Sequence, residues 1–90
     1  MKILGFERYN EINSSRIRIK SKKVEDDEII YETHITINGE GIDGLIYCGI
    51  DGKLECFQFH NKEGFCLSDI YGEDNINKLI IKKLKKIGAI

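Results

Sequence analysis

Three glycine-containing turns constrain the fold of this chain more than any other feature, because they set the pairing of consecutive segments. Asn38-Gly39 lies between two runs of alternating hydrophobicity, and this dipeptide favours a two-residue type I′ hairpin. The segments GIDGK (49–53) and NKEGF (61–65) each carry a glycine at the fourth position, typical of a type I turn followed by a bulge. The three turns together predict an antiparallel meander.

The segments before these turns have the two-residue period of strands. In SSRIRIKSKK, Ile17 and Ile19 alternate with basic residues, and IIYETHITIN (29–38) alternates again with many β-branched side chains. VEDDE (24–28) between them is typical of a turn. We therefore expect a hairpin here, with the arginines and lysines of the first strand on its outer face.

Extending the three turn registers along the chain divides the side chains between two faces of the sheet. The first, an aliphatic face, collects Ile29, Tyr31, Thr33, Ile35, Ile37, Ile42, Ile46, Cys48, Leu54, Cys56, Cys66 and Ile70. The second, an acidic–aromatic face, collects Ile30, Glu32, His34, Asp43, Leu45, Tyr47, Glu55, Phe57, Phe59, Phe65, Leu67, Asp69 and Tyr71. Because side chains alternate, a slip of one residue in any hairpin exchanges the two faces beyond it.

The C-terminal segment EDNINKLIIKKLKKIG (73–88) predicts an amphipathic helix. Asp74 is a candidate N-cap and Gly88 a candidate C′ residue. One stripe is apolar: Ile76, Leu79, Ile80, Leu84 and Ile87. The opposite face is basic: Lys78, Lys82, Lys85 and Lys86.

These elements predict one α+β domain spanning residues 1–90: a four- to six-stranded antiparallel β-meander with one C-terminal amphipathic helix packed on one face. KILGF (2–6) is a candidate first strand. A single helix covers only one face. We expect it on the aliphatic face, and the alternative is a helix packed on the aromatics, with residues 1–12 or a second subunit on the other side.

The turn region also matches the letters of a dinucleotide fingerprint, G-x-G-x-x-G, at Gly39, Gly41 and Gly44. That fingerprint requires a helix directly after the glycines, because the helix N-terminus binds the pyrophosphate. Here LIYCGI follows, which has the composition of a strand. The glycines are therefore assigned to a hairpin.

Catalytic and metal-binding constellations are weak. Cys56, His60 and Cys66 lack the spacing of a zinc site and lack a third group that would orient a Cys–His pair. The carboxylates Asp43, Glu55 and Asp69 fit solvated strand positions rather than a shaped acid–base cavity. We expect no enzyme activity, no catalytic residues, no bound metal and no cofactor.

Composition and charge set the broad class. The chain is 41% hydrophobic and 32% charged, with three cysteines at irregular spacing, which argues against a disulfide framework. It lacks a signal peptide and any apolar run near the ~20 residues of a membrane span, so we expect a cytoplasmic protein. The abundance of Ile, Lys and Asn, which have AT-rich codons, indicates a bacterial or phage gene.

The charges are segregated along the chain although the net charge is only −1. Residues 1–24 carry seven Lys or Arg and two Glu, and residues 76–90 carry five Lys and no acid. Between them, residues 25–75 carry thirteen acids and two Lys. Such a distribution leaves surfaces of opposite sign that can steer charged partners.

The leading functional hypothesis is a non-enzymatic protein-binding module, an inhibitor or immunity-type protein. It would dock its acidic–aromatic face on the basic surface of a toxin or a nucleic-acid-processing enzyme. The candidate partner-binding residues are Asp43, Tyr47, Glu55, Phe57, Phe59, Phe65, Asp69 and Tyr71. The alternative is a nucleic-acid-binding domain that uses the basic residues of 16–23 with the helix lysines, and a second alternative is a small homodimeric domain.

Overall fold

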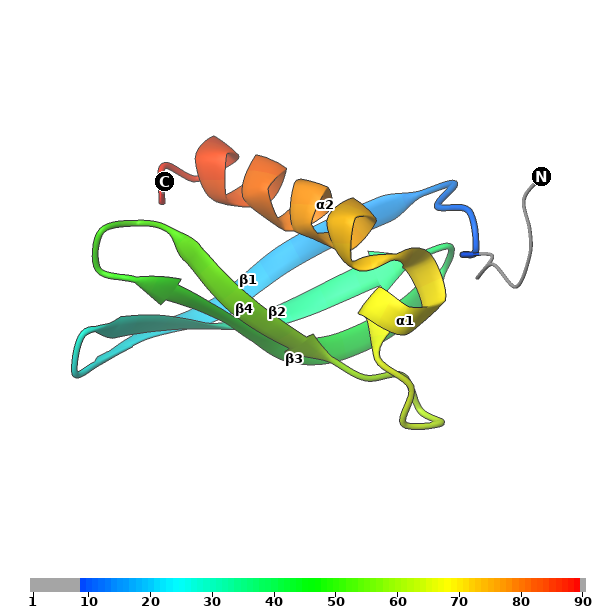
Figure 1. Cartoon of the computed structure of the whole chain (residues 1–90), viewed down its shortest axis with the longest axis horizontal. Coiled ribbons are helices and arrows are strands. Elements are labelled where there is room, and N and C mark those ends of the chain that lie inside the picture. Colours follow the sequence, from blue (N-terminus) through cyan, green and yellow to red (C-terminus); the bar gives the residue numbers. More distant parts are fainter. Residues whose placement is uncertain (1–8, 90) are drawn as a thin grey trace.

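The computed structural model describes residues 9–89, so the candidate strand at residues 2–6 lies outside the described part of the chain. Within that part, four strands form one antiparallel sheet in the order β1 (Ser15–Glu25), β2 (Glu28–Ile37), β3 (Glu40–Gly49) and β4 (Leu54–Phe59). A short helix, α1 (Leu67–Tyr71), leads into α2 (Glu73–Lys86), which lies across one face of the sheet (Figure 1). The predicted α+β meander with a C-terminal helix is confirmed.

The Asn38-Gly39 hairpin forms as predicted. Both residues have positive φ, 51° and 87°, as a type I′ turn requires, and Ile37 pairs with Glu40. In the β1–β2 hairpin the turn residue Asp26 also has a positive φ of 54°. These turns set the register of β2 with β3 and of β1 with β2 from Glu25 back to Ser21.

The other two glycine turns also close as predicted. The Gly49 N–H donates to the Lys53 carbonyl at 2.9 Å, and the Asn61 N–H donates to the Phe65 carbonyl at 2.9 Å. The glycine at the fourth position of each turn has a φ close to 90°. His60 and Cys66 lie opposite each other in an isolated bridge just before α1.

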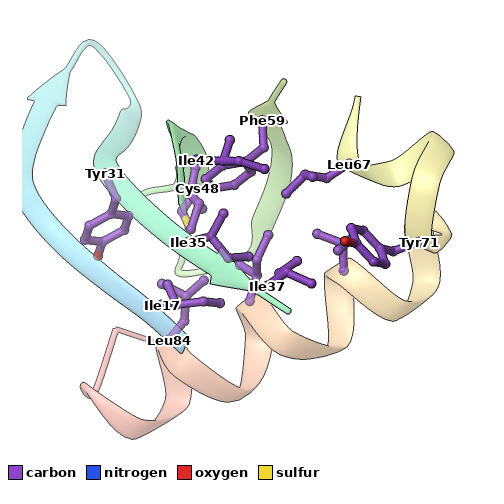
Figure 2. Packing of buried hydrophobic residues seen from close by; sticks show 13 residues of the cluster. Ile17, Tyr31, Ile35, Ile37, Ile42, Cys48, Phe59, Leu67, Tyr71 and Leu84 are labelled. Carbon is purple, nitrogen blue, oxygen red and sulfur yellow. The ribbon is translucent and has the colours of Figure 1, made fainter. Parts of the chain in front are cut away.

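The helix packs on the aliphatic face of β2 and β3, as expected. Ile35, Ile37 and Ile46 are completely buried beneath α2, whose Ile76, Ile80 and Leu84 are also at 0% exposure. Figure 2 shows how these side chains meet in the space between sheet and helix. The remaining buried hydrophobic residues are Ile17, Tyr31, Ile42, Cys48, Phe59, Leu67 and Tyr71.

The predicted face of the β4 aromatics is wrong, because β4 contains a β-bulge. Cys48 pairs with Leu54, but the preceding Tyr47 pairs with Cys56, so Glu55 is an extra residue in β4. Beyond the bulge the alternation is inverted, and Phe57 turns toward the covered face. The turn at 49–53 predicted the pairing of the residues next to it correctly. The inserted Glu55 then exchanged the faces of the β4 side chains that follow it.

Phe59 therefore becomes part of the core, where its ring lies against Gly44. A Cβ at position 44 would come within 2.4 Å of the Phe59 ring and 2.2 Å of the Gln58 carbonyl oxygen, so only glycine fits. Phe57 lies beside Phe59 with ring centroids 6.2 Å apart. Gly44, the third glycine of the fingerprint, is thus needed to leave space for the Phe59 ring.

The strand expected around residues 65–71 is also wrong. α1 covers Leu67–Tyr71, and its two buried residues, Leu67 and Tyr71, are four positions apart on one helical face. Over so short a segment, residues 67, 69 and 71 fit a two-residue period, and residues 67 and 71 equally fit a helical one. The placement of Leu67 and Tyr71 on an open sheet face is corrected accordingly.

Of the two helix caps predicted for α2, only the C-terminal one is confirmed. Gly88, with a φ of 78°, donates its N–H to Lys85 O, and Ala89 donates to Leu84 O at 2.8 Å, which is the Schellman arrangement predicted for Gly88 as C′. At the other end the N-cap is Gly72, with a φ of 95°, and not Asp74. The direct connection from α1 moves the start of the helix back to Glu73.

Candidate functional site

The eight residues predicted to bind a partner do not share one surface. Phe59 and Tyr71 are buried at 2% and 5% exposure, and Phe57 is half-buried against the core. Phe65, 59% exposed, lies in the last turn, and Asp69 lies on α1. Only Asp43, Tyr47 and Glu55 remain with the open face of the sheet, as their pairing and contacts place them. The expected acidic–aromatic face is therefore not formed.

The open face, the side of the sheet away from α2, has an apolar centre. Ile30 pairs directly with Tyr47, and Leu45 lies two residues from Tyr47 on the same strand. All three side chains are half-buried. Cys56 pairs with Tyr47 and extends this apolar centre onto β4.

A charged network lies next to the apolar centre and depends on a second bulge. Ile19 pairs with Thr33 but Ser21 pairs with Glu32, so Lys20 is an extra residue in β1. Lys20 Nζ lies 3.1 Å from Asp43 Oδ1, and His34 Nδ1 lies 2.7 Å from the same oxygen. The hydrogen bond from His34, followed by that from Lys20, lowers the pKa of the Asp43 carboxyl.

The opposite end of the open face is acidic. A hydrogen bond between Glu28 and Glu55, with smaller contributions from desolvation and from nearby carboxylates, raises the pKa of Glu28. Both of these side chains lie at the end of the sheet that carries the β1–β2 turn. The open face therefore changes from acidic at this end to basic at the end where Arg16 and Arg18 lie.

Two of the three cysteines lack the electrostatic environment of an activated nucleophile. Desolvation raises the pKa of Cys48, which is buried, and of Cys56, and the carboxylate of Glu55 raises both further. A reactive thiolate needs the opposite shift, produced by positive neighbours. Cys66 lies opposite His60, but Cys56 is on the open face and Cys48 in the core, so the predicted placement of all three cysteines on the aliphatic face is wrong.

Four positively charged side chains line a groove between β1 and α2. This groove has a volume of about 410 Å³. Its lining residues are Ser15, Arg16, Ile17, Leu79, Lys82, Lys83 and Lys86. Within residues 9–89, none of the four cations that line the groove pairs with a carboxylate. Two other lysines of β1, Lys20 and Lys23, do form such pairs.

This arrangement follows from the local sequence. α2 buries its Ile76, Ile80 and Leu84 stripe on the sheet, so the lysines at positions 82, 83 and 86 lie to the side of that stripe, beside the edge strand β1 (Figure 1). The sequence named the basic residues of 16–23 and the helix lysines together as an alternative nucleic-acid site, but it gave no contact between them. That Arg16 and three helix lysines share one groove depends on which edge of the sheet α2 covers.

A second hollow continues the groove beyond the start of β1. It has a volume of about 610 Å³ and shares Ser15 and Leu79 with the basic groove. The sequence offered no signal for it. Its other lining residues are Tyr9, Asn10, Glu11, Ile12, Asn13, Ser14, Asn75 and Lys78.

The segment that lines this hollow is held by the hairpin turn. Asn38 Oδ1 accepts hydrogen bonds from the N–H groups of Asn13 and Ser14 at 2.8 and 3.2 Å. Its Nδ2 donates to the Glu11 carbonyl at 2.9 Å, and the Asn10 N–H donates to Ile70 O at 2.8 Å. Residues 10–14 are therefore fixed against the sheet end and α1, with the aromatic ring of Tyr9 beside them.

No protein-family model, curated protein or solved structure matches the chain. Among the side chains of residues 9–89, no group of three or more His, Cys, Asp or Glu could hold a metal ion. None of the described helices is long and apolar enough to cross a membrane.

Proposed function

We propose that this protein binds a single strand of nucleic acid in the basic groove between β1 and α2. The observation that carries the proposal is the set of four cations, Arg16, Lys82, Lys83 and Lys86, which line one groove and pair with no carboxylate within residues 9–89. Unpaired cations in a groove attract the repeating charges of a phosphate backbone.

The composition of the groove favours a polymer over a small anion. Its cations come from two elements, and the helix lysines at positions 82, 83 and 86 cover more than one turn of α2. Ile17 and Leu79 supply an apolar floor between them. Such a floor suits the sugar and base portions of a nucleotide, while the lysines contact phosphates at the rim.

The neighbouring hollow favours a single strand over a duplex. Tyr9 is 48% exposed at that hollow and offers an aromatic face on which an unpaired base can stack. The amide side chains of Asn10, Asn13 and Asn75 supply donors and acceptors for base edges. A base can stack on an aromatic side chain only when it is free of its own helical stack, as in a single strand.

The salt dependence of binding tests this proposal. Fluorescence anisotropy of a labelled oligothymidine is measured at several salt concentrations. If all four groove cations contact phosphates, we expect a slope of log affinity against log salt of about −3, from roughly 0.7 per contact on a single strand. The Lys82→Gln/Lys83→Gln variant is expected to reduce that slope by about 1.4.

The matched control is Lys53→Gln/Lys62→Gln, which removes the same charge from two turns that do not line the groove. This control is expected to retain the wild-type slope. Equal slopes for the two double variants, or no saturable binding of the oligonucleotide to the wild type, would contradict the proposal.

A second candidate function is docking to another protein through the open face, as a cytoplasmic inhibitor or immunity-type protein. It is favoured by the apolar centre of Ile30, Leu45 and Tyr47, which lies beside the acidic pair Glu28 and Glu55. An apolar centre with an acidic rim suits a partner with a basic surface. Buried Phe59 and Tyr71 are excluded from this surface, which is smaller than the one expected from the sequence.

A further inference from the structure

The basic end of the open face contains a small hollow that is separate from the groove. Arg16 pairs with Thr36, and Arg18 pairs with His34, in two alternate cross-strand pairs of β1 and β2. These four side chains surround a hollow of about 170 Å³. Two arginines and a threonine therefore line one hollow of the sheet.

The positive charges at this hollow are available to a ligand. Arg16 and Arg18 are exposed, and within residues 9–89 neither pairs with a carboxylate. The acids of the same face have other partners: Lys20 and His34 bind Asp43, and the Ser21 hydroxyl donates to Glu32. Because Lys20, in the β1 bulge, forms an ion pair with the Asp43 carboxylate, this carboxylate does not pair with either arginine.

His34 is held in place beside the arginines. Its Nδ1 hydrogen-bonds to Asp43, and its ring lies over Gly41, where an added Cβ would come within 2.8 Å of Nε2. The second glycine of the fingerprint thus leaves room for the imidazole. The ring forms one wall of the hollow and provides a spectroscopic reporter for it.

We propose that this hollow binds a phosphate group, and that in the complex this phosphate belongs to the strand held in the groove. Arginine forks donate paired hydrogen bonds to phosphate oxygens, and the Thr36 hydroxyl can donate another. Arg16 lines both the hollow and the groove, so a strand that leaves the groove reaches the hollow by passing over the β1 edge. The second half of this inference rests on the proposed function, and the first half does not.

The first experiment uses inorganic phosphate alone, with the imidazole signals of His34 and the Nε–H signals of Arg16 and Arg18 followed by NMR. In the wild type we expect saturable shifts at these signals. Arg18→Gln is expected to abolish the saturable His34 shift, while Lys82→Gln/Lys83→Gln, which changes only the groove, leaves it intact. The amide spectrum of Arg18→Gln checks that the sheet remains folded. Shifts that stay linear in phosphate concentration, or a His34 response that survives Arg18→Gln, overturn the site.

The second experiment measures the salt slope for oligothymidine binding to Arg18→Gln. Loss of one phosphate contact is expected to lower the slope by about 0.7. An unchanged slope overturns the claim that the bound strand reaches the hollow. If phosphate saturates the His34 signals but the oligonucleotide binds neither form, the proposed function fails and the phosphate site stands.

Discussion

The two faces of the sheet are built from alternate residues of the same strands, yet one is held by apolar burial and the other by polar interactions. On the covered face of β2, Tyr31, Ile35 and Ile37 are buried, and α2 excludes water from them. On the open face the same strand presents Glu32 and His34, which bind other polar side chains. The covered face supplies stability through apolar burial, and the open face and its β1 edge hold the charges that a ligand can use.

The largest effect is expected from truncating an aromatic residue on the covered face. Phe59→Ala should destabilise the fold by about 3–5 kcal/mol, because the side chain is fully buried and its space against Gly44 would remain empty. Chemical denaturation followed by circular dichroism measures this loss. Phe65→Ala, the control from an exposed turn, is expected to change stability by less than about 0.5 kcal/mol.

A smaller effect is expected at the apolar centre of the open face. Tyr47→Ser should cost about 1 kcal/mol, since the ring is only half-buried beside Ile30. The same variant should bind oligothymidine with wild-type affinity, because Tyr47 does not line the groove. A loss of oligonucleotide binding in folded Tyr47→Ser would move the nucleic-acid site to the open face.

The smallest effect is expected at Asp43, and its sign depends on pH. The folded state lowers the pKa of this carboxyl, so its ionised form stabilises the fold above the unfolded-state value of about 3.9. That contribution is lost as the pH falls through the lower, folded-state pKa. Asp43→Asn should therefore be less stable than the wild type at neutral pH, and the difference should vanish at the acid limit of the denaturation series.

Glu55→Gln, also on the open face, is expected to change the stability of the fold in the opposite direction. The hydrogen bond that protonated Glu28 donates to the Glu55 carboxylate raises the pKa of Glu28, so two ionised carboxylates oppose folding at neutral pH. Removing one of them should stabilise the protein at neutral pH, with no difference once both are protonated. A stability change of the same sign in the two variants would contradict this account of the open face.

The candidate sites were only partly predictable, because they combine segments that are distant in the sequence. The basic composition of β1 and α2 identified Arg16, Lys82 and Lys86 as candidates for nucleic-acid contact. Their shared groove required the position of α2 against the β1 edge. The hollow beside Tyr9 depends on hydrogen bonds between the Asn38 side chain and residues 11–14, which no local pattern encodes.

The wrong placement of Phe57 and Phe59 on the acidic–aromatic face has a single local cause. The turn at 49–53 formed as its residues predicted, and the register changed afterwards at Glu55. A bulge adds one residue without altering composition or hydrophobicity, so it leaves no clear mark in the sequence. Since the side-chain period is two, this one residue was enough to move Phe57 and Phe59 from the open face to the core.

The sequence by itself determined the turns, the strands before them and the C-terminal helix. These depend on local causes: positive φ at Gly39 and Gly88, alternation along β1 and β2, and the apolar stripe of α2. Only the tertiary structure decided the bulges at Lys20 and Glu55, the helical form of residues 67–71 and the edge along which the helix lysines lie. Each of these is selected by packing between segments that are far apart in the chain, where the gain from burying Phe59, Leu67 and Tyr71 outweighs local preference.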